Sequence, residues 1–233
     1  MLAAERQRKV RSLGAEDALA RDEDLVTSTV FGLLSYLPRG RGLGALFQTL
    51  VGDHPPTEAV SLTFWPEDSG TEPDVVLETQ HAIVLIEAKL DAPFGSNQLG
   101  REWLWLLRRV KQREAAAAAQ AEESPRLMIV TITRRPLGDV ELRRRISADL
   151  LELRSVLPGP TENEVRATTW HEIADLILQS RSTELEAHAD TILDDLDYFL
   201  RSRGLREPPF DAWPMPPRRW PDCPLWYVGA ESV

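Results

Sequence analysis

Two acidic residues and a lysine form the part of this chain whose types and spacing are best suited to chemistry. Asp74 begins one predicted strand, and Glu87 and Lys89 end the next. If residues 80–81 form a two-residue hairpin turn, counting back along both strands places Asp74 directly opposite Glu87. Lys89, two residues after Glu87, points to the same face of the sheet. The sequence therefore predicts two carboxylates and an ammonium group on one face of a hairpin.

Such a pair of carboxylates is suited to binding one hard cation. Opposed strand residues have Cβ atoms about 4.5 to 5.5 Å apart, which lets both side chains reach the same ion. Mg²⁺ takes oxygen ligands and needs only one or two carboxylates with carbonyls and waters. We expect Asp74, Glu87 and the backbone carbonyl of Ala88 to bind Mg²⁺ or Mn²⁺. Lys89 would then hold the attacking water and offset charge in a phosphoryl transition state.

This hypothesis depends on the hairpin register. An odd number of turn residues would place Glu87 on the opposite face, and the site would not form. The alternative is that Asp74 caps a strand while Glu87 pairs with Lys89 as a surface ion pair. The apolar run 82–86 favours a functional role, because it is typical of a strand buried on both faces and yet leads into an acid and a lysine. Buried charges are costly unless they are paired or bind a metal.

The surrounding pattern predicts a mixed α/β fold (α+β, mixed sheet), with helices flanking a small central sheet. Its first three strands are expected to form an antiparallel meander. Thr169 and Glu172 fit a capping box at the start of a helix. The expected helices are 23–36, 43–51, 98–123, 137–156, 170–179 and 184–203, and the expected strands are 59–64, 74–79, 82–89, 126–133 and 165–169.

These motifs resemble a known family. Pro73-Asp74 and Glu87-Ala88-Lys89 match the signature of the PD-(D/E)xK nucleases, the restriction-endonuclease-like superfamily. The resemblance covers roughly residues 20–135 and extends more weakly to residues 170–178. It implies a core of one helix, three strands, a helix and a strand, followed here by C-terminal helices. Residues 89–99 are similar to a bacterial branch of uncharacterised or defence-associated members.

The resemblance also implies further site residues. A glutamate on the first helix of many members helps to hold a metal or its water, and Glu23 matches that position. A glutamine often lies on the helix after the Glu-x-Lys motif, and Gln98 matches it. An acid in the first turn of a helix is favourable without any catalytic role, so the alternative for Glu23 is a purely local one.

Family likeness implies a hydrolase, a nuclease cutting phosphodiester bonds of nucleic acid, most often DNA, with Mg²⁺ or Mn²⁺. A homodimer is expected from the likeness alone. Two other functions remain open from the sequence. One is a catalytically silent nuclease-fold protein that binds nucleic acid or acts as a scaffold. The other is an interaction module whose proline- and tryptophan-rich C-terminal segment is the functional part.

The charge distribution bears on nucleic-acid binding. A net charge of −10 argues against a protein that coats DNA through a broad basic surface. Basic residues nevertheless cluster within 101–113 and within 134–145, while acidic residues concentrate in 184–197. Arg101, Arg108 and Lys111 are the predicted phosphate contacts. The alternative is a solvated helix face without a ligand.

Composition sets the remaining expectations. A chain of 233 residues is long enough for one good core, so we expect a single domain over 1–206. Residues 207–233 are rich in proline and tryptophan, and we expect them to pack on that domain rather than to bind a partner. One cysteine, Cys223, excludes an internal disulfide and fits a reducing compartment. The absence of a long apolar segment predicts a cytoplasmic protein without a membrane partner.

Overall fold

A five-stranded mixed sheet forms the centre of the molecule in the computed structural model, which describes residues 15–38, 41–52, 59–68, 70–117, 124–135, 137–179 and 187–206. Its strands lie in chain order: β1 (Ser61–Phe64), β2 (Val75–Glu78), β3 (Ala82–Ala88), β4 (Arg126–Thr133) and β5 (Val165–Thr169). The first three are antiparallel neighbours, whereas β4 runs parallel to β3 and β5 runs parallel to β4. The predicted mixed α/β class and the antiparallel meander are confirmed.

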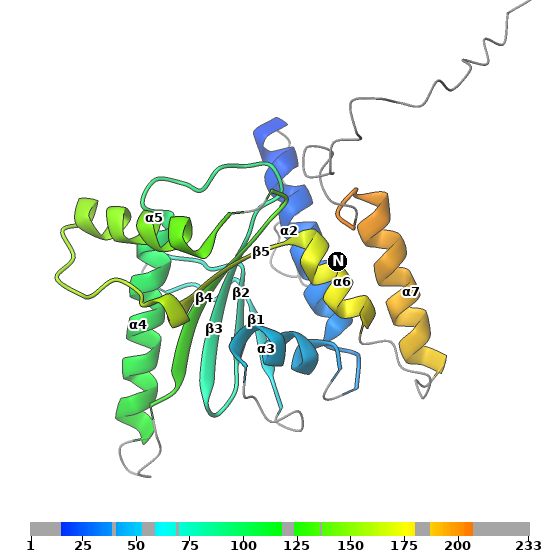
Figure 1. The fold of residues 1–233 in the computed structure, drawn as a ribbon, viewed down its shortest axis with the longest axis horizontal. Coiled ribbons are helices and arrows are strands. Elements are labelled where there is room, and N and C mark those ends of the chain that lie inside the picture. Colours follow the sequence, from blue (N-terminus) through cyan, green and yellow to red (C-terminus); the bar gives the residue numbers. More distant parts are fainter. Residues whose placement is uncertain are drawn as a thin grey trace, which may run out of the picture.

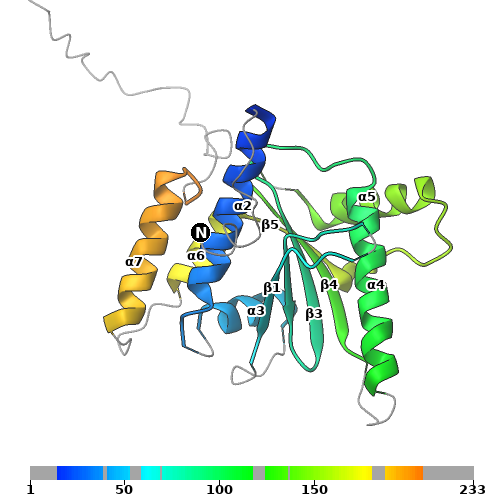
Figure 2. The same ribbon diagram turned by 180° about the vertical axis from the view of Figure 1, so that it is seen from behind.

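Helices cover both faces of this sheet (Figures 1 and 2). On one face lie α4 (Gln98–Ala117) and α5 (Asp139–Glu152). The core on the other face is formed with α2 (Ala15–Leu34), α3 (Leu43–Val51), α6 (Trp170–Gln179) and α7 (Ala187–Ser202). A short 3₁₀ helix, η1 (Glu162–Glu164), precedes β5. The described residues thus form three layers, helix, sheet and helix.

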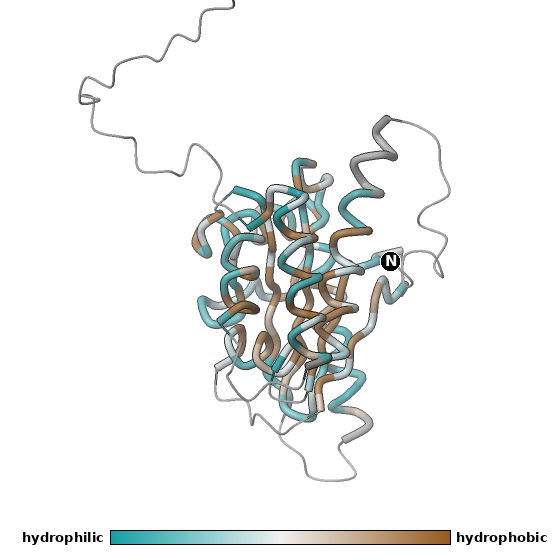
Figure 3. The backbone as a smooth tube through the Cα atoms, turned by 90° about the vertical axis from the view of Figure 1, so that its right-hand side faces the viewer, coloured by the Kyte–Doolittle hydropathy of each residue, from teal (hydrophilic) through white to brown (hydrophobic). Residues whose placement is uncertain are grey.

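Strand β3 is buried along its whole length, because it lies between two neighbours and beneath helices on both faces. Ile83 and Leu85 pack into the core under α4 and α5, while Val84 and Ile86 pack into the opposite core. Hydrophobic residues accordingly follow the interior of the molecule in Figure 3. Because side chains alternate along a strand, Glu87 falls on the α4 side.

Most element boundaries agree with the sequence-based expectations. Helices 43–51 and 170–179 and strands 126–133 and 165–169 have the predicted bounds. The predicted capping box is also present, since Glu172 Oε2 accepts the Thr169 N–H and Thr169 Oγ1 accepts the Glu172 N–H.

The first helix differs from the prediction. It begins at Ala15 rather than near 23, because residues 15–21 are good helix formers although they lack an apolar stripe. The helix expected over 137–156 spans Asp139–Glu152, and the strand expected from 59 begins at Ser61. The expected helix ends at 118–123 and 184–186 lie outside the described residues, as does the predicted tail 207–233. None of the helices that the structure describes has the length and apolar character needed to cross a membrane.

Candidate functional site

The β2–β3 hairpin has the predicted register. Its pairing extends to Val75 opposite Ile86, so the next pair in the same register is Asp74 opposite Glu87. The turn contains two residues, 80–81, because the amide and carbonyl groups that close the hairpin belong to the residues on either side of them. The two carboxylates therefore share the face of the sheet that α4 covers.

Asp74 is almost fully buried, with 9% of its surface exposed. Its Oδ2 accepts a hydrogen bond of 2.8 Å from the Ala88 backbone N–H. Burial, followed by the nearby charge of Glu87, raises the pKa of Asp74 well above its usual range. The N–H and C=O of one strand residue point toward the same neighbouring strand. The Ala88 carbonyl, a predicted metal ligand, consequently lies on the Asp74 side of β3.

Glu87 lies at the centre of the site and is only 1% exposed. Its Oε1 is 2.7 Å from Lys89 Nζ and also accepts a hydrogen bond from Gln98 Nε2. Its Oε2 has no hydrogen-bond partner in the described part of the chain. Burial, together with the nearby Glu102, raises the pKa of the Glu87 carboxyl well above its ordinary value.

Lys89 connects this centre to helix α2. Its ammonium group is 2.9 Å from Glu23 Oε1, and the other Glu23 oxygen accepts the Leu90 N–H at 2.9 Å. Burial lowers the pKa of Lys89, but the surrounding carboxylates outweigh that effect and raise it above the usual value. The structure therefore brings Glu23 of α2 into contact with Lys89 and Leu90.

The Lys89 backbone is held from two directions. Its N–H donates to the Ile132 carbonyl of β4 at 2.7 Å, and its carbonyl accepts a hydrogen bond of 3.2 Å from Trp170 Nε1. Trp170 is the first residue of α6 and is 1% exposed. The end of β3 is thus fixed by one group from β4 and one from α6.

Gln98 lies at the first position of α4, as expected from the sequence. Its Oε1 accepts the Gly95 N–H at 2.8 Å, which leaves its Nε2 to donate to Glu87. The start of α4 is fixed in turn by α5, because Asp149 Oδ2 accepts the Gly100 N–H at 3.0 Å. A Cβ atom on Gly100 would lie 2.5 Å from the Asp149 Cβ, so only glycine allows this approach.

Glu102 belongs to the site although the sequence did not single it out. It lies one helical turn after Gln98, is 1% exposed, and is near enough to Glu87 and Gln98 for both groups to influence its pKa. Burial is the main cause that raises the pKa of Glu102 to about 8. The available sequence signal was an acid within the apolar stripe of Leu99, Trp103 and Leu106, four residues after a predicted site glutamine.

The predicted phosphate contacts lie along α4. Arg101 and Lys111 are exposed, and Arg108 is half-buried. Arg109 and Arg113 bind residues of the β2–β3 hairpin instead. The Arg109 guanidinium binds Glu78, with Nε 2.8 Å from Oε1 and Nη2 3.1 Å from Oε2, and Arg113 donates to the Thr79 carbonyl at 2.7 Å. These two arginines line a cavity of about 480 Å³ near the hairpin turn, at the other end of β2 and β3 from Asp74 and Glu87.

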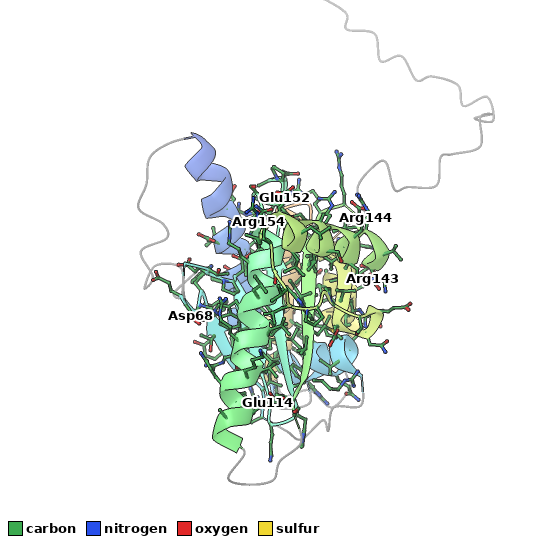
Figure 4. The ribbon with its side chains drawn as sticks, turned by 90° about the vertical axis from the view of Figure 1, so that its left-hand side faces the viewer. Asp68, Glu114, Arg143, Arg144, Glu152 and Arg154 are labelled. Atoms are coloured by element: carbon green, nitrogen blue, oxygen red, sulfur yellow. The ribbon has the colours of Figure 1, made fainter. Side chains whose placement is uncertain are left out.

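The second basic cluster is partly neutralised within the protein. On α5, Arg144 and Arg145 both bind Glu141, with contacts of 2.8 Å. Figure 4 shows Arg143 and Arg144 on this helix. Arg134 is 3.3 Å from Asp91. The exposed basic residues of α4 are therefore less neutralised by acidic partners than those of the second cluster. They are the better candidates to bind an anionic ligand.

The donor set fits a hard cation. Four carboxylates, from Glu23, Asp74, Glu87 and Glu102, surround one ammonium group, which leaves a formal charge of −3 when all are ionised. The unpartnered Glu87 Oε2 is a further indication. Within the described ranges, no three His, Cys, Asp or Glu side chains form a ready-made metal cage. Mg²⁺ does not require one, because it keeps several waters and binds through one or two carboxylates.

No protein-family model matches the sequence, and no curated protein or solved structure matches it at a significant level.

Proposed function

We propose that this protein is a metal-dependent nuclease that hydrolyses phosphodiester bonds of nucleic acid, most readily DNA. Asp74 and Glu87 would hold Mg²⁺ or Mn²⁺, and Lys89 would position the attacking water. The observation that carries the proposal is the opposed Asp74–Glu87 pair at the end of a buried strand, with Lys89 Nζ 2.7 Å from Glu87 Oε1. Buried charges in this arrangement are typical of a site that uses them.

The architecture is consistent with a restriction-endonuclease-like core. Helix α2 precedes the antiparallel meander β1–β2–β3, and α4 then leads into the parallel strand β4. This order supports the same family that the motif resembles. Fold alone does not establish activity, so the proposal depends on the site residues.

Each site residue has a role that its contacts support. A bound hard cation would supply Lewis-acid polarisation of the phosphoryl oxygen and a more acidic water. Asp74 and Glu87 would provide the anionic oxygens that hold it. Two of the three Lys89 N–H donors go to Glu87 and Glu23, and the third can bind a water or a phosphate oxygen. Gln98 fixes the orientation of Glu87, and Arg101 and Lys111 would bind phosphates along α4.

A second candidate function has an observation in its favour. Glu87 is 1% exposed, and Lys89 is already paired with two carboxylates. A closed site of this kind suits a nuclease-fold protein that binds nucleic acid without cutting it.

Incubation of the purified protein with supercoiled plasmid, linear duplex, single strands and RNA tests both candidates. Each substrate is combined with Mg²⁺, Mn²⁺ or EDTA. We expect metal-dependent cutting that falls at least about 100-fold in Glu87→Gln and Lys89→Met, since both remove transition-state interactions. Glu152→Gln, an exposed residue at the end of α5 (Figure 4), is the matched control and should cut normally.

Undiminished cutting by both site variants would overturn the site assignment. Binding by the wild type without cutting on every substrate, in either metal, would support the second candidate.

A further inference from the structure

Strand β1 lies at one edge of the sheet, and its outer side has no strand beside it in the described part of the chain. The Trp65 N–H donates to the Asp74 carbonyl at 3.1 Å, on the β2 side. Backbone groups alternate in direction along an antiparallel strand, so those of Thr63 also point toward β2, while those of Leu62 and Phe64 point away from the sheet. The backbone of these two residues is therefore available to pair with another strand.

The opposite edge of the sheet is covered by the protein itself. The Ala167 N–H of β5 donates to Asp139 Oδ1 of α5 at 2.6 Å, and Arg166 Nη1 of the same strand donates to the Thr49 carbonyl of α3 at 2.8 Å. An edge without such contacts is a template for pairing with another chain. Among the described strands, β1 is thus the open edge.

One face of β1 carries apolar side chains that the protein buries only in part. Val60, Leu62 and Phe64 pack against the core formed with α2, α3, α6 and α7, and all three are half-buried. Side chains directly opposite each other on neighbouring strands contact one another. Apolar residues at alternate positions of an added strand would therefore bury the remaining surface of these side chains.

The other face of β1 borders a groove beside α4. The 480 Å³ cavity near the hairpin turn adjoins a second one of about 260 Å³, because Glu78, Arg109 and Gln112 line both. Ser61 lines the first cavity and Thr63 lines the second, so the groove follows the direction of β1.

The two ends of this groove carry opposite charges. Arg113 lines the end at the hairpin turn, whereas Glu67 and Asp68, the latter labelled in Figure 4, line the other end. The ion pair of Arg109 and Glu78 lies on the wall that both cavities share and is neutral as a pair. A bound segment is therefore favoured when it has an acidic residue near Arg113 and a basic residue near Glu67.

We propose that β1 accepts an extended peptide of a partner protein as a sixth strand of the sheet. The peptide runs antiparallel to β1, with apolar residues opposite Leu62 and Phe64 and its other side chains toward α4. Its basic residue comes first and its acidic residue last, because β1 runs from the Arg113 end of the groove toward Asp68. This inference goes beyond the proposed function and does not depend on cutting.

The peptide Lys-Val-Thr-Val-Glu, acetylated and amidated, is the probe for this edge. It is added to the isotope-labelled full-length protein, and the backbone amides of Leu62 and Phe64 are followed by NMR. We expect both amides to shift and to become protected from hydrogen exchange on binding. Amides that are already protected without peptide, or that do not respond to it, would overturn the inference.

Methylation of the peptide backbone tests strand pairing itself. N-methyl groups on both valines, whose N–H groups face β1, should abolish binding, whereas one on the threonine should leave it unchanged. Leu62→Pro removes an outward N–H without removing a bond to β2, so it should also reduce binding. Equal binding of the two methylated peptides would reject strand addition.

Charge reversal tests the order of the peptide. Glu67→Lys, at an exposed position, should weaken binding of the probe about fivefold and favour Glu-Val-Thr-Val-Glu instead. Glu152→Lys, exposed on α5, makes the same charge change away from the groove and should bind both peptides like the wild type. If Glu67→Lys binds both peptides as Glu152→Lys does, the inference is wrong.

A second copy of this chain is the competing occupant of the edge. Sedimentation of the wild type and Leu62→Pro without peptide distinguishes the two, and we expect the same mass for both. A wild-type dimer that Leu62→Pro dissociates would assign the edge to self-association and reject the peptide partner.

Discussion

The ammonium group of Lys89 lies 2.7 Å from Glu87 Oε1, in a part of the site where Glu87 is 1% exposed. This is a buried ion pair rather than the surface pair that the sequence left open as an alternative. Removing one member of a buried pair leaves the other charge uncompensated, which costs more than the pair contributes.

Replacing Lys89 should therefore reduce both stability and cutting. Lys89→Met leaves Glu23 and Glu87 without their shared cation, and we expect the free energy of unfolding in EDTA to fall by up to about 3–5 kcal/mol. Urea denaturation measures this loss. Lys111→Met, at an exposed position of α4, should change stability by no more than about 0.5 kcal/mol. Equal stabilities of the two variants would contradict the buried pair.

Stability should depend on pH through Glu102. Its folded-state pKa of about 8 lies above the ordinary value of 4.5, so the folded state keeps a proton that the unfolded state releases between these values. The stabilisation is fully present below pH 4.5 and is lost as pH rises toward 8, by at most about 1.4 kcal/mol per pH unit for this group. Urea denaturation in EDTA from pH 5 to 9 should show a shallower fall in Glu102→Gln. Identical profiles would refute this assignment.

Part of the pH dependence of stability should remain in Glu102→Gln. Asp74 and Glu87 also have raised pKa values, so they act in the same direction.

Gly100 should tolerate no side chain. Gly100→Ala places a Cβ 2.5 Å from the Asp149 Cβ and forces α4 away from α5. We expect a loss of about 1–3 kcal/mol, typical of overpacking, together with weaker Mn²⁺ binding because Gln98 and Glu102 move with the helix. Gly32→Ala in α2 is the matched control, since nothing lies within 4 Å of its added Cβ. If both variants melt at the same temperature, the close approach of α4 and α5 is wrong.

The tryptophan that holds the Lys89 carbonyl can be tested with a paired substitution. Trp170→Phe removes the donor to Lys89, and Trp103→Phe removes a donor to the Pro158 carbonyl at 2.9 Å. Both residues are 1% exposed, so each variant should lose about 1–2 kcal/mol of stability. Only Trp170→Phe should reduce metal-dependent cutting beyond its effect on the folded fraction. A larger cutting defect in Trp103→Phe would contradict this role.

Phosphate binding along α4 should appear as a salt dependence. Arg101→Ala and Lys111→Ala should each lower the slope of log affinity against log salt by about one, with DNA binding measured in EDTA. Arg144→Ala is the control, because Arg144 is exposed on a helix and pairs with Glu141. Unchanged slopes for both α4 variants would remove these residues from the proposed interface.

The sequence by itself determined the features that depend on local pattern. A two-residue turn fixes the hairpin register, and the register places Asp74 opposite Glu87. The capping box of Thr169 and Glu172 is equally local, because its donors and acceptors lie within four residues. The fold class follows from the order of helices and strands.

Only the tertiary structure decided which distant side chains complete the site. The rotation of α4 against the sheet places Glu102 near Glu87. The packing of α2 and α6 determines that Glu23 and Trp170 bind the two ends of Lys89, its ammonium group and its carbonyl. No local period encodes these contacts, because each depends on how separate elements pack against the two faces of the sheet.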